Sequence, residues 1–348
     1  MSNTVSKRIP ETVMKKPQQS SPFSGTSPRL RDVGECVMIQ RIRSLLGKVN
    51  PPAPHGIGDD CAVLPVSTEL ASRTSGLATV DAVTLGEHFF PDTTPELVGR
   101  KLVHRNVSDI AAMGGRPNWA LLTLLSGGDL RLEWLDGFMV GLRDAAIELK
   151  MQIIGGDISA LPDGLFSAVL CVHGQAVTPI LRSTAKAGDS LWVTGTLGGS
   201  LRGHHLQFNA RIEEGCWLAE NVPVSAMMDV SDGIAKDLTA LLPADTLAAL
   251  DIHKIPISTA ALEQAQQQRD LALKAAFCDG EDYELLFATP PQTVDWLADW
   301  QRQFPHVPVT QIGTITKVPE SATSTCKLID LQTGQALDYF KGYAHFNT

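Results

Sequence analysis

The chain has 348 residues, of which 43 % are hydrophobic and 19 % charged, and it carries a formal net charge of −9 at pH 7. This is the composition of an ordinary globular protein, and no stretch approaches the ~20 uninterrupted apolar residues that would span a bilayer, so we expect no membrane segment. The excess of acidic residues argues against nucleic acid as a partner, because proteins that bind it need a basic face to release counterions from phosphates.

The first 32 residues are predicted to form a disordered tail. They are rich in Ser, Pro, Lys and Arg and contain no apolar core like that of a secretory signal. A transit peptide is the alternative, but the stretch includes Glu11 and has little amphipathic periodicity. The folded part of the chain is therefore expected to begin near residue 33.

The six cysteines are scattered along the chain without a CxxC pair. They suggest neither a zinc site nor a disulfide framework. We therefore expect a reducing compartment, the cytoplasm.

Two carboxylates lie just before the first predicted strand. The segment GIGDDCAVLP, residues 56–65, sets Asp59 and Asp60 between a glycine pair and a run of apolar residues. The segment SGLATVDAVTL, residues 75–85, is rich in β-branched residues and bounded by glycines, so we predict a strand with Asp81 in it or at its end.

The best-marked helix is predicted over residues 93–115, TTPELVGRKLVHRNVSDIAAMGG. Thr94 is its expected N-cap and Gly114 its stop. One apolar stripe of this helix consists of Val98, Leu102 and Met113. Asp109 lies at the centre of that stripe, where a charge is costly unless it is paired or bound to a metal. Asp109 is therefore a candidate ligand, with a bond to a neighbouring Arg or a cap as the alternative.

Later segments also deliver acidic residues at predicted strand ends. After a second predicted helix, residues 133–150, the short strand MQIIGGD ends at Asp157, and LFSAVLCVHGQAV predicts another strand. In the second half, AMMDVSDGIAKDLTALL predicts a strand that leads directly into a helix, with Asp229 and Asp232 at the turn. CDGEDYELLFA places Glu281 before a further strand.

Collected, these acidic residues form a set that is hard to explain by turns alone. The set is Asp59, Asp60, Asp81, Asp109, Asp157, Asp229, Asp232, Glu281 and Asp282. Each alone is a common turn or cap residue, but strand ends are where α/β proteins build ligand sites, and converging carboxylates repel unless cations lie among them. Hard oxygen ligands without His or Cys neighbours favour Mg²⁺, which usually bridges a few carboxylates to substrate phosphates. We therefore predict a nucleotide site with Mg²⁺.

The chain lacks the usual phosphate-binding motifs. It contains no GxxxxGK[ST] or GxGxxG loop and no kinase HRD or DFG set, so neither a P-loop fold nor a protein-kinase fold is indicated. The phosphates are instead expected at the metals, at the glycine-rich turn TGTLGGS and at the helix start Ser231-Asp232-Gly233.

Eight motifs in order resemble those of the thiamine-monophosphate kinase family. They are GIGDDCAVL, VDAVTLGEHF, NVSDIAAMGGRP, IIGGDIS, LRSTAKAGDSLWVTGTLG, MDVSDGIAKDL, DGEDYELLF and KGYAHF. This family belongs to the ATP-binding superfamily that includes aminoimidazole ribonucleotide synthetase. The resemblance implies an α/β (α+β) fold with an N-terminal ATP- and Mg²⁺-binding domain, residues 33–185, and a C-terminal α/β domain, residues 186–348. It also implies a homodimer formed through the mixed N-terminal sheets.

The resemblance further implies roles for single residues. The Mg²⁺ ligands around the ATP phosphates are Asp60, Thr79, Asp81, Asp109, Asp157, Asp229 and Asp232. The contacts to ATP are Gly156, Arg182 and Ser231, and the contacts to thiamine monophosphate are His88, Glu281 and Tyr343. Arg182 is also the implied catalytic group that stabilises the transferred phosphoryl group, with a surface salt bridge as the alternative.

The implied activity is ATP-dependent phosphorylation of thiamine monophosphate to thiamine diphosphate by in-line transfer assisted by Mg²⁺. The acceptor phosphate is already ionised near neutral pH, so no catalytic base is expected. The sequence departs from the family pattern at Val80, at Ile158-Ser159 and in a shortened segment over residues 200–228. These departures leave two alternatives open: another ATP-dependent enzyme of the superfamily, or a nucleotide-binding paralogue without turnover.

Overall fold

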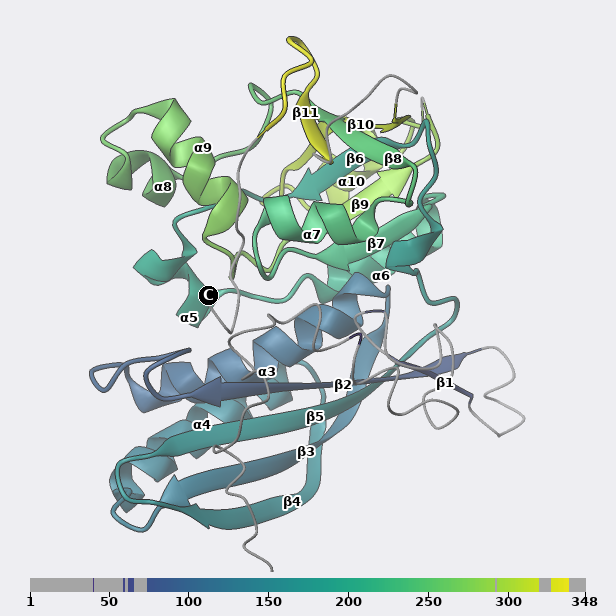
Figure 1. The fold of residues 1–348 in the computed structure, drawn as a ribbon. Coiled ribbons are helices and arrows are strands. Elements are labelled where there is room, and N and C mark those ends of the chain that lie inside the picture. Colours follow the sequence, from purple (N-terminus) through teal and green to yellow (C-terminus); the bar gives the residue numbers. More distant parts are fainter. Residues whose placement is uncertain are drawn as a thin grey trace, which may run out of the picture. The chain divides into compact units, whose positions relative to one another are not determined.

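The computed structural model describes residues 40, 59, 62–65, 74–291, 293–318 and 327–337. The predicted N-terminal tail and two predicted site residues, Asp60 and Tyr343, lie outside these residues. By backbone contacts, Leu46–Tyr343 form one compact unit. Every helix and strand named below belongs to this unit (Figure 1).

The first sheet is mixed. Its strands are β1 (Ala62–Pro65), β2 (Ser75–Thr84), β3 (Arg116–Gly127), β4 (Gln152–Leu161) and β5 (Phe166–Ala176). They lie in the order β1-β2-β5-β3-β4, and β3 pairs in parallel with β4 while the other pairs are antiparallel. Parallel neighbours need a long crossover, and helix α4 (Leu132–Glu148) supplies it.

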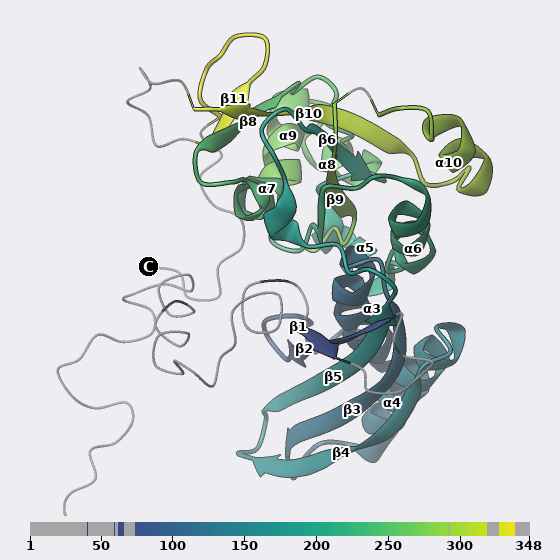
Figure 2. The same ribbon diagram turned by 90° about the vertical axis from the view of Figure 1, so that its right-hand side faces the viewer.

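One face of this sheet is covered by α4 and by helix α3 (Pro95–Ala112), as Figure 2 shows. Successive residues of a strand point to opposite faces. In β2, Leu77 and Val83 are fully buried on the covered side, whereas Val80 is 59 % exposed. The same alternation buries Leu170 and Val172 in β5. The first sheet therefore has a covered face and an open face.

The two covering helices pack backbone to backbone. A Cβ at Gly141 of α4 would overlap the carbonyl oxygen of Glu96 in α3, and a Cβ at Gly99 of α3 would overlap that of Phe138 in α4. The absence of side chains at these two positions lets the helices approach closely, which fixes α3 against α4.

The second sheet is covered on both faces. Its strands are β6 (Ser190–Thr194), β7 (Ala226–Asp229), β8 (Thr246–Leu250), β9 (Leu285–Thr289), β10 (Val309–Lys317) and β11 (Leu328–Asp330), in the order β11-β8-β10-β6-β9-β7. Every residue of β6, β7, β8 and β9 is buried, as expected for strands that have no solvent-facing side.

Short helices flank this sheet. They are the 3-10 helices η3 (Arg182–Thr184) and η4 (Ser200–Arg202) and the α-helices α5 (His204–Gln207), α6 (Ile212–Asn221), α7 (Ile234–Leu241), α8 (Thr259–Gln264), α9 (Arg269–Cys278) and α10 (Leu297–Gln303). Ile234 and Leu238 of α7 and Phe277 of α9 pack in one core cluster with strands β6 to β9, whereas Trp192 and Trp300 belong to a second cluster shared with the first sheet.

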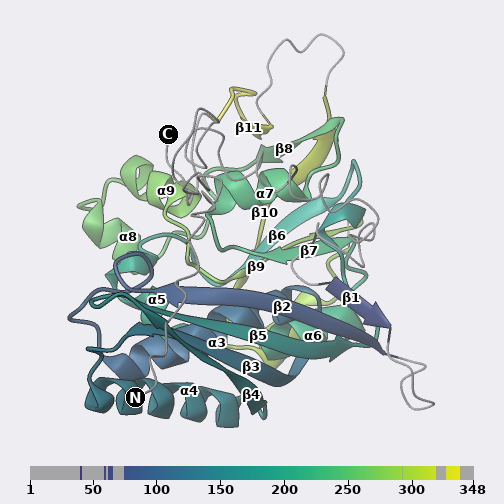
Figure 3. The same cartoon turned by 60° about the horizontal axis from the view of Figure 1, so that its bottom comes forward.

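Helix α3 also contacts the second half of the chain, because it packs against α5, α6 and β7 (Figure 3). Nδ1 of the buried His104 accepts a hydrogen bond from the backbone N–H of Ala210 at 3.3 Å. A Cβ at Gly215 of α6 would overlap the carbonyl oxygen of Ala111, so this contact is also close. Helix α3 is therefore shared by both halves.

The observed architecture confirms the expected mixed α/β fold with two sheets. The helix predicted over residues 93–115 is α3, which begins at Pro95 after Thr94 and ends before Gly114, although no side-chain hydrogen bond from Thr94 caps it. The boundary predicted at residue 185 lies between the end of β5 and the start of β6 and stays a prediction. Within the described part of the chain, no helix combines the length and apolarity that a membrane span requires.

Candidate active site

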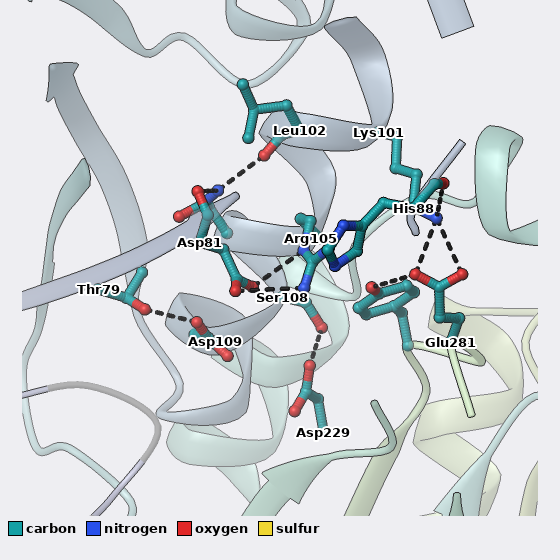
Figure 4. Close-up of polar contacts among 12 residues, drawn as sticks. Thr79, Asp81, His88, Lys101, Leu102, Arg105, Ser108, Asp109, Asp229 and Glu281 are labelled. Atoms are coloured by element: carbon teal, nitrogen blue, oxygen red, sulfur yellow. Dashed lines mark hydrogen bonds and ion pairs between the residues drawn. The ribbon is translucent and has the colours of Figure 1, made fainter. Parts of the chain in front are cut away.

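One side of α3 carries four polar side chains into the interior. They are Lys101, Arg105, Ser108 and Asp109, which we call the α3 polar band. Their spacing of i, i+4, i+7 and i+8 places them on the same side of the helix. Arg105 and Asp109 bond to β2, Ser108 bonds to the end of β7, and Lys101 bonds to the loop before β9 (Figure 4).

Two members of the band bond to the implied metal ligands that lie on β2. Oδ2 of Asp109 accepts a hydrogen bond from the hydroxyl of Thr79 at 2.5 Å. Arg105 donates to both carboxylate oxygens of Asp81, from Nε at 3.1 Å and from one terminal nitrogen at 3.2 Å. Such a bidentate pair fixes the orientation of the carboxylate as well as its position. The structure therefore ties both Thr79 and Asp81 of β2 to the same side of α3, and their role as metal ligands stays a prediction.

Ser108 holds an implied metal ligand from the second half of the chain. Its hydroxyl donates to Oδ2 of Asp229, at the end of β7, at 2.6 Å. Asp229 is 2 % exposed, and its pKa is raised to about 6, chiefly by this burial and also by Asp81 and Asp232, whereas the hydrogen bond from Ser108 and the charge of Arg182 oppose the shift. Asp81, Asp232 and Arg182 thus each lie within electrostatic reach of Asp229.

The turn after β7 holds Asp232 at the start of α7. Its carboxylate pairs with Nζ of Lys236 at 2.5 Å, and its backbone N–H donates to the buried carboxylate of Asp237 at 3.0 Å. The carbonyl oxygen of Ser231 accepts a hydrogen bond from the N–H of Glu281 at 2.8 Å. The predicted ATP contact and the predicted thiamine-phosphate contact are therefore joined through the backbone.

Asp59 and Arg182 form an ion pair that the sequence analysis did not predict. The side chain of Asp59 is almost fully buried, and it accepts hydrogen bonds from the backbone N–H of Arg182 at 3.2 Å and from Nε at 3.3 Å. Asp59 thus orients the guanidinium group, while its neighbour Asp60, the implied metal ligand, lies outside the described residues. Arg182 does form the ion pair considered as the alternative, although with a buried partner, and its implied catalytic role stays a prediction.

The two described residues implied for thiamine monophosphate meet at Lys101. Nζ of Lys101 donates to the carbonyl oxygen of His88 at 2.9 Å and to the carboxylate of Glu281 at 2.8 Å. The ring of His88 is fixed separately, because its Nδ1 accepts a hydrogen bond from the N–H of Thr84 at 3.1 Å. Tyr343, the third residue of this set, lies outside the described residues.

The structure does not bring Asp157 to this cluster. In the sheet, Asp157 of β4 pairs with Thr123 of β3, and Thr123 pairs with Val169 of β5. Asp81 of β2 pairs with Leu170, the next residue of β5. Paired residues point to the same face and successive ones to opposite faces, so Asp157 points to the open face and Asp81 to the face covered by α3. Strands β5 and β3 also separate the two, a distance of about 14 Å at the usual strand spacing. The hydroxyl of Ser159 donates to Asp157 at 2.7 Å.

Gly156 has a structural reason to be glycine besides the implied contact with ATP. Its φ is +158°, and a Cβ at this position would overlap the carbonyl oxygen of Leu122 on β3. A glycine is therefore needed for β4 to pair with β3 at this point.

The clustered oxygen atoms suit a hard cation that also binds a ligand. Within the described ranges, no three His, Cys, Asp or Glu side chains lie close enough to form a metal site by themselves. Asp81 and Asp232 nevertheless raise the pKa of Asp229, so the carboxylate of Asp229 is repelled by both of the others. An all-oxygen donor set with mutual repulsion fits Mg²⁺ shared between a few carboxylates and phosphate groups.

Lys101, Arg105 and Ser108 were not predicted from the sequence as parts of the site. A signal was available, because their spacing places them on the same side of a helix that also carries Asp109. Cations on a helix usually face solvent, however, and spacing alone does not distinguish a solvated face from a buried one.

The fold and the site define the class of protein to which the chain belongs. The family described as AIR synthase related protein, N-terminal domain, matches residues 58–176, and its C-terminal counterpart matches residues 172–324. The chain with its two mixed sheets is thus an AIR synthase related protein.

Within this class, the chain is similar to thiamine-monophosphate kinases. The enzyme of Rhodopirellula baltica is 37 % identical over 76 % of this chain and 84 % of its own length, and that of Escherichia coli K12 is 34 % identical over 90 % and 99 %. The solved structure of AaThiL complexed with AMPPCP and TMP is 28 % identical, covers 92 % of this chain and 100 % of that one, and has a TM-score of 0.76. The chain belongs to the thiamine-monophosphate kinase family, which confirms the resemblance found in the sequence.

We expect Gly156→Ala to lower the free energy of unfolding by about 2 kcal/mol or more, because the added methyl group forces β4 away from β3. Thermal and urea unfolding without any nucleotide measure this loss, with Gly164→Ala in the β4–β5 turn as a control for the loss of a glycine with positive φ that has open space around it. If Gly156→Ala were as stable as the wild type, the pairing of β4 with β3 would not require a glycine, and only the implied contact with ATP would explain it.

Proposed function

We propose that this chain transfers the γ-phosphoryl group of ATP to the phosphate of thiamine monophosphate, giving thiamine diphosphate and ADP. The observation that carries the proposal is the α3 polar band, which includes Asp109 and bonds to Asp81, Asp229 and Glu281 from three other segments of the chain. The similarity to AaThiL complexed with AMPPCP and TMP supports it, because that structure pairs an ATP analogue with the acceptor.

The residues of this chain would hold Mg²⁺ and both phosphorylated substrates. The groups that fit the metal are Thr79, Asp81, Asp109, Asp229 and Asp232, with Asp60 and Asp157 as further implied ligands. Mg²⁺ bound there would screen the phosphate charges and align the in-line transfer. Arg105 and Ser108 orient Asp81 and Asp229, so these carboxylates are already fixed before ligands bind.

Arg182 is the candidate for stabilising the transferred phosphoryl group. The buried carboxylate of Asp59 holds its Nε and its backbone N–H, which restricts the side chain to one direction. A guanidinium group fixed in this way can stabilise developing charge without first being ordered. The acceptor phosphate is itself the nucleophile, so the proposal needs no general base.

The cytoplasmic location that the sequence predicts belongs to this proposal. It is supported by Cys171 and Cys216, which form no disulfide within the described part of the chain, as is typical of a reducing compartment.

A direct test follows ADP release with ATP, Mg²⁺ and thiamine monophosphate, with thiamine and buffer as alternative acceptors. We expect release that depends on thiamine monophosphate and yields thiamine diphosphate in equal amount. Nucleotide binding without release would favour a paralogue without turnover, and release with another acceptor would favour another enzyme of the superfamily.

Asp109→Asn should lower kcat by at least about 100-fold at saturating Mg²⁺, because it removes a ligand charge, while Thr79 can still donate to the remaining oxygen. Asp144→Asn, which changes an exposed aspartate of α4 paired with Arg143, is the matched control and should keep the wild-type kcat. Circular dichroism checks the fold of both variants. A near-normal kcat in Asp109→Asn would contradict the metal-ligand assignment.

We also infer that the chain forms a homodimer through the open face of the first sheet. Val80, Cys171 and Leu121 are neighbours across β2, β5 and β3 on this face, and Val80 and Leu121 are exposed. Exposed apolar rows of this kind mark contact surfaces. Asp157 points to the same face, so its implied role as a ligand is compatible with a site that a second copy completes.

Val80→Glu should convert a dimeric wild type into monomers, because it places a charge in the centre of the contact. Light scattering after size-exclusion chromatography measures the mass. Ile147→Glu, at a 67 % exposed position on α4 on the other side of the sheet, is the control and should stay dimeric. A monomeric wild type, or an unchanged Val80→Glu dimer, would contradict this inference.

A further inference from the structure

Lys101 is a fully buried cation with two different partners. Its side chain is 0 % exposed, and Nζ lies 2.8 Å from each carboxylate oxygen of Glu281 and 2.9 Å from the carbonyl oxygen of His88 (Figure 4). Burial lowers the pKa of Lys101, and Glu281 opposes this shift. A lysine is rarely buried to this extent unless it is paired. Lys101 therefore ties the loop after β2 to the loop before β9.

The backbone around Glu281 is held in an uncommon conformation. Glu281 has a φ of +55° and Tyr283 one of +51°, values that cost of order 1 kcal/mol or more for residues other than glycine. Their N–H groups donate to the carbonyl oxygens of Ser231 and Val230, both at 2.8 Å, so the loop follows the chain just after β7. Such strain persists where surrounding contacts determine the conformation.

The carboxylate of Glu281 is held but not enclosed. Its side chain is 20 % exposed, and its Oε1 also lies 3.4 Å from the hydroxyl of Tyr283, which is itself buried and stacked on Phe208 at a ring distance of 4.0 Å. Lys101 and Tyr283 thus fix the carboxylate from the protein side and leave part of it accessible to a ligand.

We propose that Lys101 is a positioning residue for the acceptor, an inference that rests on the proposed function. It holds the Glu281 carboxylate of the second half and the His88 segment of the first half at a fixed separation, and so sets the site that receives the thiamine moiety. This moiety carries a cationic thiazolium ring and an aminopyrimidine, both of which a fixed carboxylate can recognise.

The alternative role of Lys101, simple charge balance, predicts an effect of the opposite sign. Without the cation, the site becomes more negative and a cationic ligand should bind more tightly. If Lys101 instead fixes geometry, its removal should weaken binding of the thiamine moiety although the site is more negative. The direction of the change in affinity therefore separates the two roles.

The test is Lys101→Met, which keeps a side chain of similar length but removes the ammonium group. We expect the KM for thiamine monophosphate to rise about 10- to 100-fold, because hydrogen bonds to charged groups contribute about that factor, while kcat and the KM for ATP change less than about threefold. The Kd for thiamine, measured by calorimetry without ATP, should rise by the same factor, because the contact concerns the thiamine moiety and not the phosphate.

His104→Gln is the matched control. His104 lies on the same helix, is 2 % exposed and also contacts the second half, through Ala210. It should lower the melting temperature without raising the KM for thiamine monophosphate relative to that for ATP. The double variant Lys101→Met/Glu281→Gln removes both charges, so it does not depend on tolerance of an unpaired carboxylate. It should bind thiamine no more weakly than Glu281→Gln alone, because both residues act through one carboxylate.

An unchanged or lower KM for thiamine monophosphate in Lys101→Met would overturn the proposal, as would an equal rise for ATP, a loss confined to the phosphorylated ligand, or additive effects in the double variant. These outcomes require a wild type that phosphorylates thiamine monophosphate. A wild type that releases no ADP with this acceptor would refute the proposed function instead, and the two failures are thus distinguishable.

Discussion

The arrangement of the site depends on the burial of polar groups along one side of α3. Lys101, Arg105, Ser108 and Asp109 lie on a helix that is packed between the first sheet and the second half of the chain, where an unpaired polar group costs about 1–3 kcal/mol. Each must therefore have a partner, and the partners belong to β2, β7 and the loop before β9. The need to pair these four groups fixes segments that are far apart in the sequence.

This constraint links the donor and acceptor ends of the proposed reaction. Ser108 and Asp109 fix groups assigned to the metal and ATP, and Lys101, two turns earlier on the helix, fixes groups assigned to thiamine monophosphate. In-line transfer requires reacting atoms within about 3–3.5 Å in the right orientation. A rigid helix that is anchored to α4 through glycine contacts can maintain such a relation better than two independent loops.

Local signals in the sequence predict the local structure well. Thr94 and Gly114 bracket α3 to within two residues, and a turn with Asp229 and Asp232 does connect β7 to α7. Strand β3 was not predicted, because a continuous apolar run without clear alternation does not distinguish a strand from a buried helix. The position of Asp157 also depends on strand order, and pairing between distant segments leaves no periodic trace. The partners of Lys101 and Arg105 were missed for the same reason.

The hydrogen bond from Ser108 to Asp229 offers the most direct measurement of whether the α3 polar band positions the site. Ser108→Ala should lower kcat/KM for ATP about 10- to 100-fold and the free energy of unfolding by only about 1 kcal/mol. Thr289→Val removes another buried hydroxyl bond, to Trp192 in the second sheet, and should lose similar stability with wild-type kinetics. If kcat/KM for ATP in a folded Ser108→Ala variant stayed within twofold of the wild type, the α3 polar band would contribute to stability only and would not position the site.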